Sequence, residues 1–164
     1  MAGIPEQFKV NREVKTGVCR LIEVFGGLEY SHAIVGLYRN REEALKFLER
    51  VGLRVIDTNS YMYVDPWDGH ITVGRRYLLE AEPRILYLDI IHELVHVRQW
   101  FEGKELYDRR YSYVERPTEL KAYAVVVEEA QRIGMTGKEI VDYLEVPWIS
   151  KKELELMTKR LGIR

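Results

Sequence analysis

The chain has 164 residues and a formal net charge of −1, with 46% hydrophobic and 31% charged residues. A chain of this length most simply forms one domain with a substantial core. The near-zero charge indicates no nucleic-acid or anionic-membrane partner. No run of about 18 apolar residues is present, so we expect a soluble protein that does not enter a membrane.

Cys19 is the only cysteine, which excludes an internal disulfide and a cysteine-based zinc site. Met1–Val10 is mixed polar and lacks a signal-peptide pattern, so we predict a cytoplasmic protein. Only three Asn and three Gln accompany the many charged residues. This bias is typical of thermophile proteins.

The first 59 residues predict a helix, a strand and a second helix. Asn11–Phe25 carries apolar residues at helical spacing, whereas Glu29–Tyr38 is rich in aromatic and β-branched residues and is strand-like. Asn40–Val51 is helical, with Asn40 as the N-cap and Glu43 completing a capping box.

Three short strands are expected next, at Leu53–Asp57, Ser60–Asp65 and His70–Tyr77, with a turn at Pro66–Gly69. Helical patterns dominate the remainder of the chain. They cover Ile85–Phe101, Pro117–Ile133, Thr136–Glu145 and Ser150–Leu161, and an irregular tyrosine-rich loop occupies Lys104–Glu115.

The stretch Ile85–Phe101 contains His92-Glu93-Leu94-Val95-His96, an HExxH pattern. Residues four apart share one helix face, so both imidazoles can bind one Zn²⁺. Glu93 is rotated by about 100° from His92, where it can reach a metal-bound water without ligating the metal. The helix is apolar nearly all round and is therefore expected to be buried. The alternative is a pair of core histidines hydrogen-bonded to their neighbours.

Zinc hydrolases use three protein ligands and keep a fourth position open for water. Glu119 is our candidate for the third ligand, because it begins an otherwise apolar face of Pro117–Ile133. A helix that buries this face buries Glu119 with it, and a buried ionised carboxylate needs a cation. The alternative is a first-turn carboxylate stabilised by the helix dipole.

His92-Glu93-x-x-His96, followed on the next helix by Glu119-x-x-Ala122, resembles the gluzincin zinc metallopeptidases. The compact size resembles the small soluble archaeal members called minigluzincins. The resemblance covers about residues 60–133.

The resemblance implies that His92, His96 and Glu119 hold one Zn²⁺ per chain and that Glu93 is the general base. It also implies that the strand His70–Tyr77 is the sheet edge along which an extended peptide lies.

Strands that mostly precede helices argue for an α+β fold. We expect a small, mostly antiparallel sheet packed against an active-site helix and a glutamate helix, with extra helices at both ends. The chain would form one metallopeptidase-like domain. Within it, 1–59 is an N-terminal extension, 60–133 the catalytic core and 134–164 a C-terminal helical tail.

The leading hypothesis is a zinc-dependent endopeptidase that hydrolyses peptides or unfolded proteins with a metal-activated water and Glu93 as base. One alternative is a non-catalytic or latent zinc-binding regulatory protein with a peptidase-like fold. Another is a DNA-associated regulator with a peptidase-like core.

Peptide hydrolysis also needs a hydrogen-bond donor, besides zinc, for the tetrahedral oxyanion. The sequence offers Tyr111, Tyr113, Arg109, Arg110 and His70 without ranking them. Tyr123, one turn after Glu119, either orients a ligand or simply packs. Asp89, one turn before His92, either hydrogen-bonds that histidine or stabilises the helix dipole.

The C-terminal tail has two capping boxes, Thr136 with Glu139 and Ser150 with Glu153. An apolar segment around Trp148 separates the two helices. The tail either completes the core or covers the active-site cleft and keeps the enzyme latent.

Overall fold

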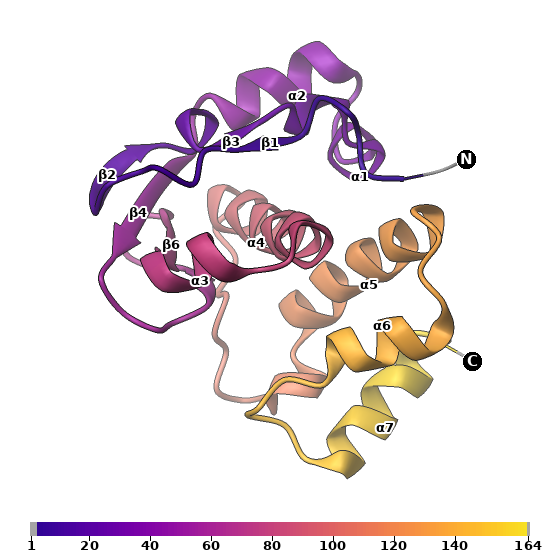
Figure 1. Cartoon of the computed structure of the whole chain (residues 1–164). Helices are drawn as coiled ribbons and strands as arrows, with labels where there is room; N and C mark the ends of the chain where they lie inside the picture. Colours follow the sequence, from indigo (N-terminus) through magenta and orange to yellow (C-terminus); the bar gives the residue numbers. More distant parts are fainter. Residues whose placement is uncertain (1–2, 164) are drawn as a thin grey trace.

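The computed structural model describes residues 3–163, and Figure 1 shows its course. The strands are β1 (Lys9–Val10), β2 (Gly17–Arg20), β3 (Phe25–Gly26), β4 (Gly52–Ile56), β5 (Met62–Val64) and β6 (Ile71–Gly74). The α-helices are α1 (His32–Gly36), α2 (Arg41–Leu48), α3 (Arg75–Glu80), α4 (Pro83–Phe101), α5 (Pro117–Arg132), α6 (Gly137–Leu144) and α7 (Lys151–Arg160). Short 3₁₀ turns are η1 (Leu21–Glu23), η2 (Leu28–Tyr30) and η3 (Tyr113–Glu115).

The main sheet has four strands in the order β2-β4-β6-β5, and β1 pairs with β3 in a separate two-stranded ribbon. The β2–β4 and β5–β6 pairs are antiparallel, whereas β4 and β6 run parallel. The sheet is therefore mixed, with two antiparallel pairings out of three. This sheet and the packed helices α4 and α5 confirm the predicted α+β class.

The third predicted strand, His70–Tyr77, is wrong in its second half and in its place in the sheet. β6 ends at Gly74, and Arg75 begins helix α3, which buries Leu78. β6 also lies inside the sheet, because Ile71 pairs with Leu53 on one side and with Val64 on the other. The edge strand on this side is β5, so the implied peptide-binding edge does not lie at His70–Tyr77.

Two predictions for the first 59 residues are also wrong. Asn11–Phe25 contains the strand β2, the turn η1 and the first residue of the strand β3 instead of a helix. Glu29–Tyr38 contains η2 and the short helix α1 instead of a strand, with the Ser31 hydroxyl accepting from Ile34 N as an N-cap. Asn40 caps α2 as predicted, with its side chain accepting from Glu43 N at 2.9 Å. The predicted capping box is incomplete, because the Glu43 carboxylate pairs with Lys46 and not with the Asn40 backbone.

The capping boxes predicted at two helix starts in the second half of the chain are confirmed. Pro83 and Pro117 stand in the first turns of α4 and α5. The capping boxes of Thr136 and Ser150 are both formed at the starts of α6 and α7. These starts depend on local hydrogen bonds, which the sequence specifies directly.

Helix α4 lies at the centre of the molecule, with the N-terminal strands and helices on one side and α5, α6 and α7 on the other (Figure 1). Its core residues include Leu86, Tyr87, Ile90 and Leu94, none of them measurably exposed. Among the described residues, no helix is long and apolar enough to cross a membrane.

The turn between β5 and β6 is fixed to α4. The Trp100 indole N–H donates to Pro66 O at 2.9 Å. Gly69, with φ +73°, lies flat against the indole, and an added Cβ would come within 2.6 Å of that ring. This contact requires glycine and holds the edge strand beside the histidine helix.

Candidate metal centre

Helix α4 carries both histidines of the HExxH pattern to one buried place. Glu82 caps its start, since the carboxylate accepts from the backbone N–H groups of Arg84 and Ile85. Only 6% of His92 and 2% of His96 is exposed, and their Nε2 atoms lie 3.1 Å apart. The helical spacing of four therefore does what the sequence predicts and aims both rings at one point.

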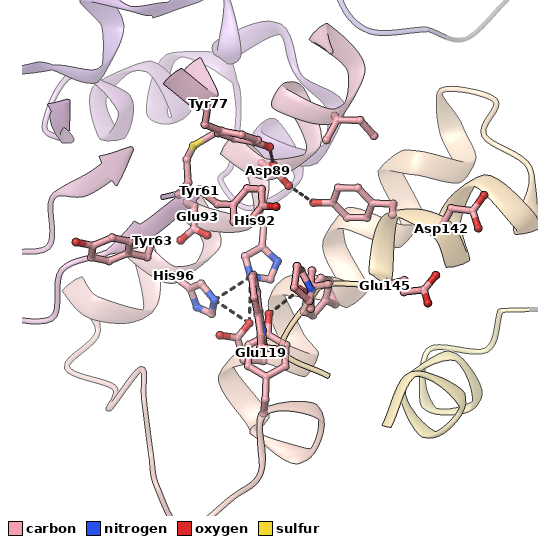
Figure 2. A pocket seen from close by; sticks show the side chains of 18 of the residues that line it. Tyr61, Tyr63, Tyr77, Asp89, His92, Glu93, His96, Glu119, Asp142 and Glu145 are labelled. Carbon is pink, nitrogen blue, oxygen red and sulfur yellow. Dashed lines mark hydrogen bonds and ion pairs between the residues drawn. The ribbon is translucent and has the colours of Figure 1, made fainter. Parts of the chain in front are cut away.

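Helix α5 brings Glu119 to the same point. Its Oε2 lies 3.1 Å from His92 Nε2 and 3.2 Å from His96 Nε2, and only 4% of the residue is exposed. Figure 2 shows the carboxylate facing the two imidazoles. The structure thus assembles a buried His92/His96/Glu119 group whose donor atoms could hold a metal ion.

The spacing of the three donor atoms fits a tetrahedral ion. Zinc–nitrogen and zinc–oxygen bonds of about 2.0–2.1 Å place neighbouring ligand atoms roughly 3.3 Å apart in a regular tetrahedron. The three observed separations are 3.1, 3.1 and 3.2 Å. Two imidazoles and one carboxylate also form a donor set typical of zinc sites with an open position.

Gln99 sets the proton position on His96. Its side-chain oxygen accepts from His96 Nδ1 at 2.7 Å, and its amide N–H donates to Thr118 O at 3.1 Å. A neutral imidazole that donates from Nδ1 presents a lone pair at Nε2. In its neutral form His96 would therefore present the Nε2 lone pair to a metal ion between the three donor atoms, and Gln99 also ties α4 to the start of α5.

The ring of His92 packs against Tyr123, with ring centroids 4.3 Å apart. Its Nδ1 has no hydrogen-bond partner among the described residues. Asp89 does not hydrogen-bond His92, nor does it lie in the first turn as a dipole partner. Instead it accepts hydrogen bonds from the hydroxyls of Tyr77 and Tyr143.

Charges in the group are strongly coupled. Burial acts to raise the pKa of Glu119, but hydrogen bonds and charge from His92 and His96 outweigh it and hold the pKa well below its usual range. Burial acts to lower the pKa of His96, but Glu119 and Glu93 raise it to about 9. Burial lowers the pKa of His92. In the metal-free protein, the protonated imidazole of His96 is therefore the cation that stabilises the Glu119 carboxylate.

Glu93 stands beside this group as a buried carboxyl without a cationic partner. Only 8% of it is exposed, and its Oε2 has no hydrogen-bond partner among the described residues. Burial raises its pKa to about 8, helped by the negative charges of Glu119 and Asp89 and opposed by His96. A carboxyl with a pKa near neutrality can both accept and release a proton at physiological pH.

The group and Glu93 line one large cavity of about 1100 Å³. Its walls come from the β5 region, α3, α4, the loop before α5, α5 and α6, and Figure 2 shows part of them. Tyrosines form much of the surface. They are Tyr61, Tyr63, Tyr77, Tyr107, Tyr113, Tyr123 and Tyr143. The three candidate donor atoms are therefore reachable by a ligand despite their burial.

Of the predicted oxyanion donors, only Tyr113 lines the cavity. Its hydroxyl oxygen lies 2.6 Å from that of Tyr123, which was predicted either to orient a ligand or to pack and which also lines the cavity. Tyr111 and His70 are not among the lining residues; Tyr111 is exposed, and His70 lies against Gly52 beside Asp68. Arg110 is paired with Asp108 and also lies outside the cavity lining.

The sequence offers little indication of the hydrogen-bonding roles of Gln99 and Asp89. Gln99 shares the helix face of the histidines, a polar residue among apolar ones. The partners of Asp89 are 12 and 54 residues away along the chain, so no local pattern could reveal them.

The described residues define a candidate metal site made of two histidines and one glutamate on adjacent helices. Comparison of the chain with protein-family models, with curated proteins and with solved structures finds no match.

Proposed function

We propose that this protein is a zinc-dependent endopeptidase in which His92, His96 and Glu119 hold the metal. The observation that carries the proposal is Glu93, a buried carboxyl with an unpartnered oxygen in the same cavity as the three donors. A purely structural metal site does not need such a group, and leaving it unpaired costs stability.

Bound zinc would supply Lewis acidity, which lowers the pKa of a water ligand and polarises a carbonyl oxygen. Glu93 accepts a proton from the attacking water and delivers it to the leaving amine, so that the peptide bond is exchanged for an acid and an amine. The raised pKa of Glu93, about 8 in the metal-free protein, suits both transfers.

The Tyr113–Tyr123 pair supplies the hydrogen bond to the oxyanion. Burial raises the pKa of both hydroxyls, so both keep their hydrogens. One hydrogen is used between the two oxygens, which lie 2.6 Å apart, and the other is free to donate to a ligand. A donor placed beside developing negative charge is worth several kcal/mol in catalysis, about 3 in measured cases.

An extended peptide would lie along β5, the edge strand of the sheet. β5 pairs with β6 on one side only, and residues Tyr61, Met62 and Tyr63 line the cavity. Main-chain hydrogen bonds to an open strand bind peptides with little sequence selectivity. This arrangement suits an endopeptidase acting on unfolded chains.

The test uses zinc-loaded protein and denatured casein at raised temperature. We expect cleavage that stops with a chelator and returns with added zinc. Glu93→Gln should keep its zinc and lose at least about 100-fold of the rate. Wild-type protein that never cleaves, or Glu93→Gln that cleaves as well as wild type, would contradict the proposal.

A latent zinc-binding protein is the second candidate, and Trp148 favours it. The segment Val146–Trp148 lines the cavity, and Trp148 packs against Tyr61 and Tyr113, which come from different sides of it. Removing the indole with Trp148→Ala would then raise cleavage above that of wild type. Equal rates for the two proteins would argue against latency through this side chain.

A further inference from the structure

Asp89 forms a distinct corner of the cavity, one turn before His92 on α4. Its carboxylate accepts a hydrogen bond from the Tyr77 hydroxyl on α3 and another, at 2.7 Å, from the Tyr143 hydroxyl on α6. Figure 2 shows both bonds and the position of Asp89 near His92 and Glu93. A rise of 1.5 Å per residue separates Asp89 from His92 by about 4.5 Å along the helix.

This corner holds a carboxyl group with no cation beside it among residues 3–163, and burial raises the pKa of that carboxyl above its usual range. None of the ion pairs formed by the described residues includes Asp89. Both of its donors are neutral, because burial raises the pKa of the Tyr77 and Tyr143 hydroxyls far above the physiological range. Hydroxyl donors stabilise a carboxylate only in part, and a cation stabilises it further.

The surroundings are acidic as well. The cavity lining includes Glu82, Glu139, Asp142 and Glu145 besides the acidic groups near the candidate metal site, whereas its basic side chains are Arg84, Arg116 and the two histidines of that site. Arg84 is already paired with Glu139 at 3.2 Å. The charge balance of the lining therefore favours a positively charged ligand.

Glu93, the proposed general base, adds a second carboxyl group to this part of the cavity. More than nine-tenths of it is buried, its Oε2 has no partner, and it lines the same cavity as Asp89. Tyr61 and Tyr77 pack edge to face, with centroids 5.1 Å apart, and line the cavity together with Tyr143. Aromatic walls suit a cation carried on a hydrocarbon stem, since the stem packs on the rings and the faces attract the charge.

We propose that Asp89, held by Tyr77 and Tyr143, is the pocket for a lysine or arginine side chain of the peptide substrate. The pocket lies beside the metal site, so the enzyme cleaves next to basic residues. This inference rests on the proposed peptidase function and names the substrate class of the same site.

The experiment measures peptide binding to zinc-loaded Glu93→Gln protein by fluorescence anisotropy. The probes are labelled hexapeptides with acetylated and amidated ends that differ at one internal position, lysine or its uncharged counterpart norleucine. We expect the lysine peptide to bind at least tenfold more tightly. Adding Asp89→Asn should bring the ratio close to one, whereas Asp57→Asn, at an exposed carboxylate outside the cavity, should leave it unchanged.

Three results would overturn the pocket. The first is equal binding of the two peptides to Glu93→Gln protein. The second is a lysine-to-norleucine affinity ratio that stays the same after Asp89→Asn. The third is tighter binding of a lysine-free peptide with a free N-terminal amine, if Asp89→Asn abolishes that binding. The last result would assign the pocket to the α-ammonium group. If Asp89→Asn does not fold, the affinities of the lysine and norleucine peptides for Glu93→Gln protein decide whether the pocket binds a basic side chain.

Failure of the pocket and failure of the peptidase function give different results. Wild-type protein that cleaves casein without preference for basic residues disproves the pocket and leaves the function standing. Lysine-selective, Asp89-dependent binding without turnover supports the pocket and disproves the peptidase.

Discussion

Gln99 illustrates how one neutral side chain prepares the metal site. It accepts the Nδ1 hydrogen of His96 and donates its own amide hydrogen to Thr118 O. Both of its functional groups are thus engaged, and the amide cannot rotate without losing both bonds. The imidazole is held in the tautomer and orientation that metal binding needs.

We therefore predict that Gln99→Leu lowers zinc affinity by about 10- to 100-fold, because His96 loses the acceptor that fixes its tautomer. Competition with a chromophoric chelator measures the change. Gln131→Leu, the same substitution at an exposed position of α5, serves as the control and should bind zinc as wild type does. Unchanged affinity in Gln99→Leu would contradict this role.

Among the elements, α4 and α5 meet at the candidate metal site, and the buried Glu119 in this contact needs a positive charge beside it. Glu119 is buried against two imidazoles that repel each other when both are charged. A zinc ion bound here would take the place of the His96 proton and would supply two positive charges. The two helices should therefore be held together more firmly in the metal-loaded protein.

This predicts a thermal stability that depends on zinc. At a free zinc concentration of about 100 times its Kd, the folded state should gain about 2.7 kcal/mol, seen as a higher Tm in scanning calorimetry. Glu119→Gln removes a charged ligand, so its Tm should respond little to zinc. Glu128→Gln, on the exposed face of α5, should respond as wild type does. A full zinc response in Glu119→Gln would exclude Glu119 as a ligand.

For the whole molecule, the unusual pKa values predict how stability changes with pH when zinc is absent. The pKa of His96 is raised from 6.5 to about 9, so its stabilising charge is complete below pH 6.5 and is lost as the pH rises through 9. The pKa of Glu93 is raised from 4.5 to about 8, so its burial costs more as the pH rises through that range. Both effects have the same sign.

Chelator-treated protein should therefore unfold more easily at pH 8.5 than at pH 6.5, by about 2 to 4 kcal/mol in urea denaturation. Zinc needs deprotonated ligands, so the stabilisation that it gives should grow over the same interval. In Glu93→Gln the decline should be smaller, because only His96 still titrates there. Greater stability of the chelated wild type at pH 8.5 would refute the assigned pKa directions.

Local patterns in the sequence were sufficient to predict the helices in the second half of the chain. Helix α4 is apolar nearly all round, and Pro83, Pro117, Thr136 and Ser150 mark helix starts through backbone geometry and capping hydrogen bonds that involve only nearby residues. The convergence of His92 and His96 also follows from helical spacing alone.

Tertiary pairing decided what the sequence left ambiguous in the first half. Residues 17–20, Gly-Val-Cys-Arg, are too few to show a strand or a helix period, and their pairing with β4 selects the strand. The same is true of the sheet edge, because strand order depends on contacts between segments distant in the chain.

The candidate site shows the same division. The sequence by itself determined that His92 and His96 share a helix face and that Glu119 begins an apolar one, since both facts follow from the helical period. Only the tertiary structure decided that the Glu119 oxygen lies 3.1 and 3.2 Å from the two imidazoles and that Tyr77 and Tyr143 hold Asp89. The helical period fixes directions within one helix, whereas the packing of whole helices sets distances between them.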